Sequence, residues 1–335
     1  VLLRERFGGG PAFLKPPLGT GSMFCAEVPH EAALEALWQP YYEGSREVAA
    51  SDPLWAREFG RSGERYHLLL EDRLGTFSLP WEEELRERLP VHEVSVDGVV
   101  VEPAVFVHGI TDKLIPHTRD GREHMWRTTR LPAALRSALE RRSADLARGL
   151  GIRIGGFHME FRLEQTPPGA ADAIVAGVPV RAVPLECASR LGGAYMQSFW
   201  LEATGFDAVA FLAGQACGDQ VTAAVRHLRP SIMLNLWPDG DGELAAVEGV
   251  EAVTAAHPDL LREVVVYDRP GDGVLLSSGA ERGTGHAHFV DASLDLSGEA
   301  EESPAARHAY RRLERAFLFA QDTIRLRTLS PERAR

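Results

Sequence analysis

The sequence has few cysteines and no long apolar segment. Three cysteines occur among its 335 residues, at Cys25, Cys187 and Cys217, and their spacing matches no metal-binding motif. An odd number of thiols cannot pair completely, so we expect a reducing, cytoplasmic setting rather than a disulfide framework. No apolar stretch reaches the length of a membrane-spanning helix, and we expect neither a signal peptide nor a membrane partner.

Positive charge is also scarce. Lysine and arginine total 36 against 48 aspartates and glutamates, which gives a formal net charge of −12. No long run of basic residues occurs, and this argues against nucleic acid or an anionic membrane as the main partner. A small anionic ligand is not excluded, because a local cationic pocket can exist on an acidic protein.

The remaining composition is typical of a folded protein of two or three domains, with 44% hydrophobic and 25% charged residues. Apolar runs predict strands at 11–15, 23–28, 92–97, 99–107, 231–236, 263–267 and 286–290. Helical spacing predicts helices at 30–42, 132–149, 207–227 and 304–324. Asp97-Gly98 is a hairpin signal, so we expect the strands on either side of it to pair with each other.

Two further segments, at 156–162 and 183–193, carry the strongest chemical signal. Each has the alternation of a β-strand, in which successive side chains point to opposite faces. In the first, Phe157, Met159 and Phe161 share one face, and His158, Glu160 and Arg162 share the other. In the second, Leu185 and Cys187 oppose Glu186, Ala188 and Arg190.

If these two strands are neighbours, Glu160, Glu186 and an arginine converge on one polar surface. Carboxylates suit Mg²⁺, and arginine suits phosphate oxygens. This combination is what a magnesium–nucleotide site needs. A solvated sheet face with ordinary charge pairs accounts for the same spacing, so the pattern alone leaves both interpretations open.

A glycine-rich segment follows the strand at 11–15. Lys15 ends that strand, and Gly19, Gly21 and Ser22 come shortly after it. Glycine lets backbone N–H groups approach a phosphate closely, and lysine supplies a compact positive charge. The spacing is not that of a P-loop. A plain turn beside a surface lysine is the alternative.

Several of these segments together resemble the ATP-grasp superfamily, in particular the carboxylate–amine ligases that include the L-amino-acid ligases. The resemblance lies in H-x-E-F at 158–161, L-E-x-A-x-R-L-G-G at 185–193 and E-A-T-G-F-D at 202–207. Further similar segments precede them in family order, at 13–22, 87–97 and 110–113. The resemblance covers roughly residues 11–225 and leaves out the family's N-terminal lobe, so we expect a fragment of a longer protein.

The resemblance implies an α+β ATP-grasp fold, in which two α+β subdomains clasp ATP, followed by a smaller C-terminal α+β domain. It implies a partial lid subdomain with the glycine-rich loop at 1–97. A second subdomain with the magnesium site follows at 98–227, and the C-terminal domain at 228–335.

The resemblance also implies roles for single residues. Glu160 and Glu186 would bind Mg²⁺, or Mn²⁺ in its place. Arg190 and Lys113 would be catalytic contacts to the transferring phosphate. ATP would be bound by Lys15, Gly19, Gly21, Ser22, Glu87 and Glu93, with 68–72 as a rival to Glu87 for adenine.

Other positions carry weaker expectations. His158 is expected to be a partner of the site rather than a base, and His124 and Arg127 lie where the family places substrate-facing residues. A plain exposed loop is an equally good account of His124 and Arg127. Ala188 departs from the family, which usually has asparagine there, so metal binding could be weaker or use another ligand. His286 and His288 alternate on one strand, which is a weak metal signal.

The activity implied is ATP-dependent ligation. ATP would phosphorylate a carboxylate, and an amine would then displace phosphate to form an amide or peptide bond. Amino acids are the expected substrates and a homodimer the expected assembly. A carboxylase or a purine-pathway ligase is an enzyme alternative. An ATP-binding module without turnover is the alternative from another class, favoured by Ala188.

Overall fold

The computed structural model describes residues 12–15, 26–51, 69–72, 91–115, 124–274, 284–297 and 303–329. The helices are α2 (Glu31–Ser51), α5 (Ala133–Gly149), α6 (Met196–Thr204), α7 (Ala208–Cys217), α8 (Val250–Ala256) and α9 (Pro304–Thr323). The first strands are β1 (Ala12–Lys15), β2 (Ala26–Val28), β3 (Leu69–Asp72), β4 (Val91–Val101), β5 (Ala104–Ile115), β6 (Met125–Thr128), β7 (Ile154–Gln165), β8 (Ala173–Val175) and β9 (Val178–Ala188). The later strands are β10 (Ser231–Leu236), β11 (Gly242–Glu248), β12 (Leu261–Val266), β13 (Gly273–Val274), β14 (Gly285–Val290) and β15 (Arg325–Leu329).

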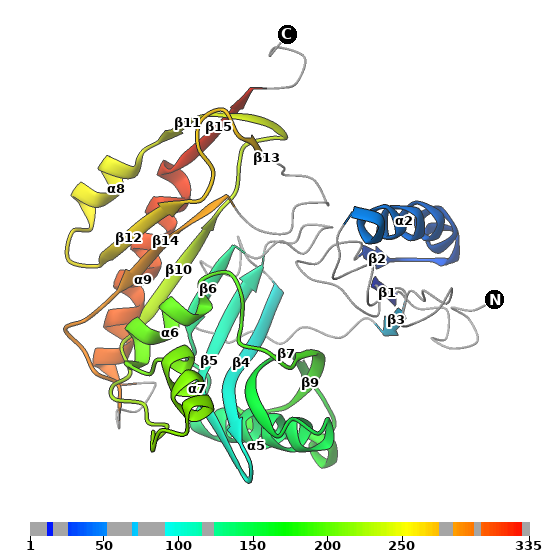
Figure 1. Cartoon of the computed structure of the whole chain (residues 1–335), viewed down its shortest axis with the longest axis vertical. Helices are drawn as coiled ribbons and strands as arrows, with labels where there is room; N and C mark the ends of the chain where they lie inside the picture. Colours follow the sequence, from blue (N-terminus) through cyan, green and yellow to red (C-terminus); the bar gives the residue numbers. More distant parts are fainter. Residues whose placement is uncertain are drawn as a thin grey trace.

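A large antiparallel sheet organises the described part of the chain. Its nine strands run in the order β12-β14-β10-β6-β5-β4-β7-β9-β8. Helices α6 and α7 lie on one face, and α5 and α9 lie on the other (Figure 1). Two small sheets, β2-β1-β3 and β13-β11-β15, flank it. No helix among the described residues is long and apolar enough to cross a membrane.

The α5 side of the sheet is a hydrophobic core, and the alternation of β4 and β7 explains it. Val94 and Val96 of β4 are fully buried there, as are Phe157, Met159 and Phe161 of β7. Full burial of each such side chain contributes roughly 1.5–3 kcal/mol. The polar residues between them therefore have to point to the opposite face, where α6 lies. The prediction that Phe157, Met159 and Phe161 share one strand face is confirmed.

The C-terminal helix α9 builds the second core on the same side. Ser303 caps it by accepting a hydrogen bond from the Ala306 amide at 3.1 Å. Its apolar stripe of Tyr310, Leu313 and Phe317 is buried against β10 and β14, with the spacing of an amphipathic helix. The predicted helix at 304–324 is confirmed to within one residue.

The expected hairpin turn at Asp97-Gly98 is wrong. Strand β4 runs straight through this dipeptide with a bulge, and the turn to β5 comes at Glu102-Pro103. A Cβ on Gly98 would lie 2.2 Å from the Phe157 ring, so this glycine permits close packing rather than a turn. Asp97 consequently stays in the strand, with its side chain on the α6 face.

The expected helix at 207–227 is too long. Asp207 starts α7 by accepting a hydrogen bond from the Ala210 amide at 2.8 Å. Gly218 ends it with φ of 83°, a left-handed angle that favours glycine. The described residues from 219 to 230 are irregular.

The division at residue 228 stays a prediction. Strands β10, β12 and β14 lie beyond it, and they continue the large sheet through the pairing of β10 with β6. The expected boundary at 97–98 falls inside β4.

Candidate active site

Polar side chains from β4, β5, β7 and β9 gather on the α6 face of the large sheet. Strand register places Glu160 directly opposite Ser95 on one side and Glu186 on the other. It also places Lys113 opposite Glu93. The two carboxylate-bearing strands are therefore neighbours, which is the condition that the sequence left open.

Glu160 is held by two cations. Lys113 Nζ forms a short ion pair with Glu160 Oε1, and His158 Nε2 lies 3.3 Å from the same oxygen. Lys113 is 2% exposed and Glu160 is 20% exposed, so this ion pair is largely shielded from water. Burial raises the pKa of Glu160, but the charges of Lys113 and His158 outweigh it and hold that pKa well below its usual range. Glu160 is therefore ionised at neutral pH.

Glu186 faces this charged group from β9. Glu186 is exposed, but partial desolvation and the negative charge of Glu160 raise its pKa, and nearby cations only partly offset the rise. A bound cation would relieve this repulsion. No group of three or more His, Cys, Asp or Glu side chains suited to a metal occurs among the described residues. Two carboxylates that share a cation with phosphate oxygens fit Mg²⁺ better than a metal bound by protein alone.

A second ion pair borders the first. Arg162 of β7 pairs with Glu93 of β4, and both side chains are largely buried. Burial raises the pKa of Glu93, although Arg162 acts in the opposite direction. Glu93 thus belongs to the same polar face as Glu160, where the resemblance places a nucleotide contact.

A buried aspartate supports His158. Asp97 Oδ1 lies 2.9 Å from His158 Nδ1, and the Trp200 indole of α6 donates to Asp97 Oδ2 at 3.2 Å. Burial lowers the pKa of His158, but the charge and hydrogen bond of Asp97, together with Glu160, raise it to about 10. The imidazole is therefore charged at neutral pH and is a partner of the site, as expected. Asp97 was not predicted as a site residue, because Asp97-Gly98 was expected to form a turn. Asp97 follows Glu93 at an even spacing in the same strand, and this alternation could have indicated that both side chains share one face.

Lys15 connects β1 to the large sheet. Its Nζ donates to the Leu185 carbonyl at 2.8 Å. A register shift beside Glu160 leaves Leu185 as an extra residue in β9, which exposes its carbonyl to this contact. Lys15 therefore lies next to the strand that carries Glu186.

Arg190 does not continue the alternation of its strand, because β9 ends at Ala188. It stands instead in the loop before α6, where its guanidinium is exposed and donates to the Leu191 carbonyl at 3.1 Å. The expectation that the strand of Glu186 extends to Arg190 is wrong. Gly19, Gly21, Ser22 and Glu87 lie outside the described residues, and the side chains of 68–72 do too.

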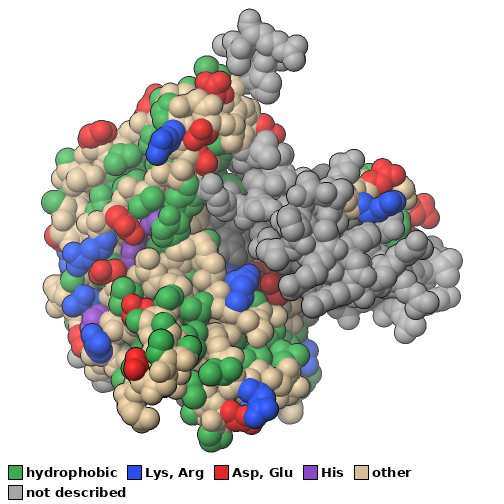
Figure 2. Space-filling view, in the orientation of Figure 1, with side chains coloured by type: hydrophobic (Ala, Val, Ile, Leu, Met, Phe, Trp, Pro, Cys, Tyr) green, Lys and Arg blue, Asp and Glu red, His purple; other side chains and the backbone are tan. Residues whose placement is uncertain are grey.

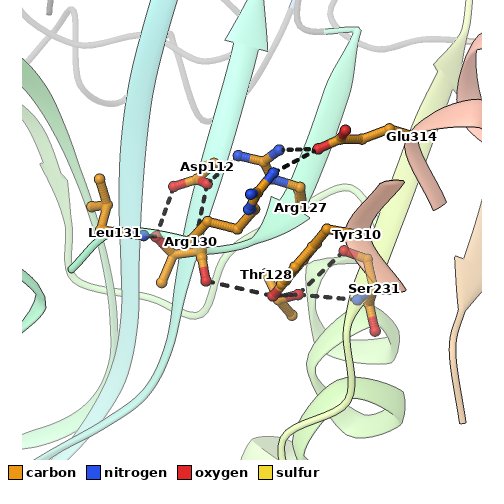
Figure 3. A network of polar contacts seen from close by, with 9 residues as sticks. Asp112, Arg127, Thr128, Arg130, Leu131, Ser231, Tyr310 and Glu314 are labelled. Carbon is orange, nitrogen blue, oxygen red and sulfur yellow. Dashed lines mark hydrogen bonds and ion pairs between the residues drawn. The ribbon is translucent and has the colours of Figure 1, made fainter. Parts of the chain in front are cut away.

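Arg127 lies on the opposite face of the sheet (Figure 3). It pairs with Asp112 at 2.7 Å and with Glu314 of α9 at 2.8 Å, and it is fully buried. Arg130 joins Glu314 at 3.1 Å. Both earlier interpretations of Arg127, a substrate-facing residue or an exposed loop, are therefore wrong. Its neighbour Trp126 is the residue of β6 that faces α6.

The two strand histidines form a separate aromatic cluster. His286 Nδ1 lies 2.7 Å from the Tyr267 hydroxyl, and Nε2 lies 3.2 Å from Glu263. His288 packs against Phe199, with ring centroids 5.2 Å apart. His124 is half-buried beside Trp237. On the face seen in Figure 2, acidic and basic side chains are interspersed over the described residues.

No family model and no curated protein matches the chain. Solved structures do. The L-amino acid ligase from Bacillus licheniformis is similar with a TM-score of 0.62 and 16% identity over 96% of this chain and 64% of that one. N5-carboxyaminoimidazole ribonucleotide synthetase from Thermotoga maritima is similar with a TM-score of 0.57 and 12% identity, over 98% of this chain and 66% of that one. A third similar structure is the biotin carboxylase domain of 2-oxoglutarate carboxylase from Hydrogenobacter thermophilus, solved with MgADP. Its TM-score is 0.54 and its identity 15%, over 86% of this chain and 55% of that one. The chain thus spans less than two thirds of each of these proteins.

Proposed function

We propose that this chain, which has the α+β ATP-grasp fold of these solved structures, is the ATP-binding part of a ligase that joins a carboxylate to an amine. One observation carries the proposal. Glu160 and Glu186 face each other across β7 and β9, and Lys113 and His158 hold Glu160. The resemblance assigns these same two carboxylates to Mg²⁺.

The proposed reaction has two steps. A carboxylate oxygen attacks the terminal phosphorus of ATP, which breaks the bond to ADP and leaves an acyl-phosphate. An amine then attacks the acyl carbon, phosphate leaves with the electrons of the carbon–oxygen bond, and the nitrogen loses a proton. Amino acids are the proposed substrates, and the L-amino acid ligase among the similar structures supports this choice.

The chain's own residues act by holding charge in place. Lys15 and Lys113 bring cations beside the two carboxylates, and Arg190 offers an exposed guanidinium in the next loop. Mg²⁺, when bound, would neutralise charge on the phosphate oxygens. Fixed charges of this kind stabilise a transition state without rearranging during the reaction. The proposal also includes Mn²⁺ as a substitute for Mg²⁺ and a homodimer as the assembly. It places the protein in the cytoplasm, a setting in which the described Cys187 and Cys217 stay free thiols.

A second candidate is an ATP-binding module without turnover. Ala188 favours it, because this residue lies opposite His158 at the position where the family usually has asparagine. An alanine side chain offers no oxygen to a metal or a phosphate.

An assay of ADP release distinguishes the two candidates. With Mg-ATP present, we expect ADP release to rise when both a carboxylate and an amine donor are supplied from a panel of amino-acid pairs. Omission of either the magnesium or the amino acids is the control. ATP binding without ADP release from any pair would contradict ligation by this chain and support the binding module.

A further inference from the structure

A row of three buried side chains connects α6 to Glu160. The Trp200 indole donates to Asp97 Oδ2 at 3.2 Å, Asp97 Oδ1 lies 2.9 Å from His158 Nδ1, and His158 Nε2 lies 3.3 Å from Glu160 Oε1. Asp97 is fully buried and Trp200 is 1% exposed. The row therefore lies beneath the site and does not depend on contact with solvent.

The loop that carries Arg190 rests on this row. A Cβ at Gly192 would lie 2.7 Å from Asp97 Oδ1 and 3.1 Å from His158 Nδ1. The glycine backbone thus packs directly against the Asp97–His158 hydrogen bond. The preceding residue, Leu191, packs against Gly156 of β7, where a Cβ would lie 2.5 Å from its side chain.

The loop conformation needs such support. Ala194 and Tyr195 have φ of 49° and 66°, in the left-handed region that side chains other than glycine rarely adopt. Residues in such conformations persist only where the surrounding structure holds them. Tyr195 is held by stacking on Tyr267, with ring centroids 4.9 Å apart. The other end of the loop is held at Gly192.

We propose that Asp97 is a positioning residue that sets Glu160 and Arg190 relative to each other. Through His158 it fixes the carboxylate, and through its contact with Gly192 it fixes the loop that bears the guanidinium. The inference rests on the proposed function, because it assigns these two groups to one magnesium–nucleotide site. Partners that orient a metal ligand from behind commonly change metal affinity about 10- to 100-fold when they are removed.

Asp97→Asn tests this role, because it keeps the shape of the side chain and removes its charge. Calorimetry should show Mg-ATP binding weakened by about tenfold or more, while binding of ATP in the presence of EDTA changes little. Thr128→Val is the matched control. It removes a buried hydroxyl that lies beside Tyr310 of α9 and Ser231 of β10 and should lower the unfolding midpoint without changing the dependence on magnesium.

Gly192→Ala provides an independent variant if Asp97→Asn does not fold. The added methyl group presses on the same hydrogen bond from the loop side, so it should also weaken Mg-ATP binding selectively. Folded variants that bind Mg-ATP as the wild type does would overturn the role of Asp97. A wild-type chain that does not bind ATP with magnesium would overturn the proposed function as well, and the two results are therefore distinct.

Discussion

At the scale of single residues, buried charges on both faces of the sheet are paired with charges of opposite sign. On the α6 face, Asp97, His158, Glu160 and Lys113 form one connected group of alternating sign. A buried ion survives only with such partners, because removal from water costs several kcal/mol per charge. Buried histidines without a carboxylate partner must instead stay neutral.

His108 is such a neutral histidine, and it predicts a dependence of stability on pH. It packs against Trp200 and Phe206, and neither ring nitrogen has a hydrogen-bond partner among the described residues. Burial lowers its pKa to about 4. Below pH 6.5 the unfolded chain takes up a proton that the folded chain refuses until about pH 4. Stability is therefore lost as the pH falls through this range.

His108→Phe should remove this contribution. Urea unfolding at pH 7 and pH 5 should show that the variant loses less free energy of unfolding than the wild type on acidification, by about 2 kcal/mol at most. Phenylalanine suits the aromatic surroundings, so the comparison isolates the proton. Equal losses in both proteins would show that His108 titrates normally in the folded state.

At the scale of elements, strand β4 shows what a local pattern can and cannot predict. The alternation of Phe157, Met159 and Phe161 predicted the buried face of β7 correctly, because period two is a property of every strand. The dipeptide Asp97-Gly98 led to a wrong prediction of a turn, because a glycine after aspartate can either form a turn or allow a neighbouring side chain to pack closely. Only the tertiary contact with the Phe157 ring decides between them.

Gly98→Ala tests the close approach. The new methyl group would collide with Phe157, and overpacking of this kind should lower the free energy of unfolding by about 1–3 kcal/mol. Gly149→Ala is the control, because a Cβ there meets nothing within 4 Å and φ is not positive. Urea denaturation measures both. If Gly98→Ala is as stable as the control variant, the packing account of β4 fails.

The helices were predictable where their ends carry a chemical signal. Ser303 with Pro304 marks the start of α9, and Gly218 marks the end of α7. This helix was expected to run to residue 227, although a glycine after an apolar run, such as Gly218, commonly ends a helix. The prediction that Arg190 lies in the strand was wrong for a related reason. The alternation of side chains does not indicate that β9 ends at Ala188.

At the scale of the whole molecule, one sheet joins segments that are far apart in the sequence. Thr128 of β6 accepts from the Ser231 amide of β10 at 3.0 Å, and its hydroxyl lies 2.9 Å from that of Tyr310 in α9 (Figure 3). Arg127 and Arg130 lie over the Tyr310 ring and share Glu314. Such long-range pairing cannot be inferred from local sequence patterns, and the division of the chain at residue 228 stays a prediction.

The candidate site was more predictable than the architecture, because its residues lie in short strands with a clear alternation. Glu160, Glu186, Glu93 and Lys113 were all identified and do share one face. Asp97 and Trp200 were not, since each acts through a contact between elements.

Calorimetric titration of ATP into this chain, with and without magnesium, tests the central claim most directly. Glu186→Ala is the decisive variant, and Glu251→Ala on the exposed side of α8 is its control. We predict magnesium-dependent binding that Glu251→Ala retains and Glu186→Ala weakens by about tenfold or more, equal to about 1.4 kcal/mol or more. Binding that is unaffected by magnesium or by the loss of Glu186 would contradict the assignment of the site.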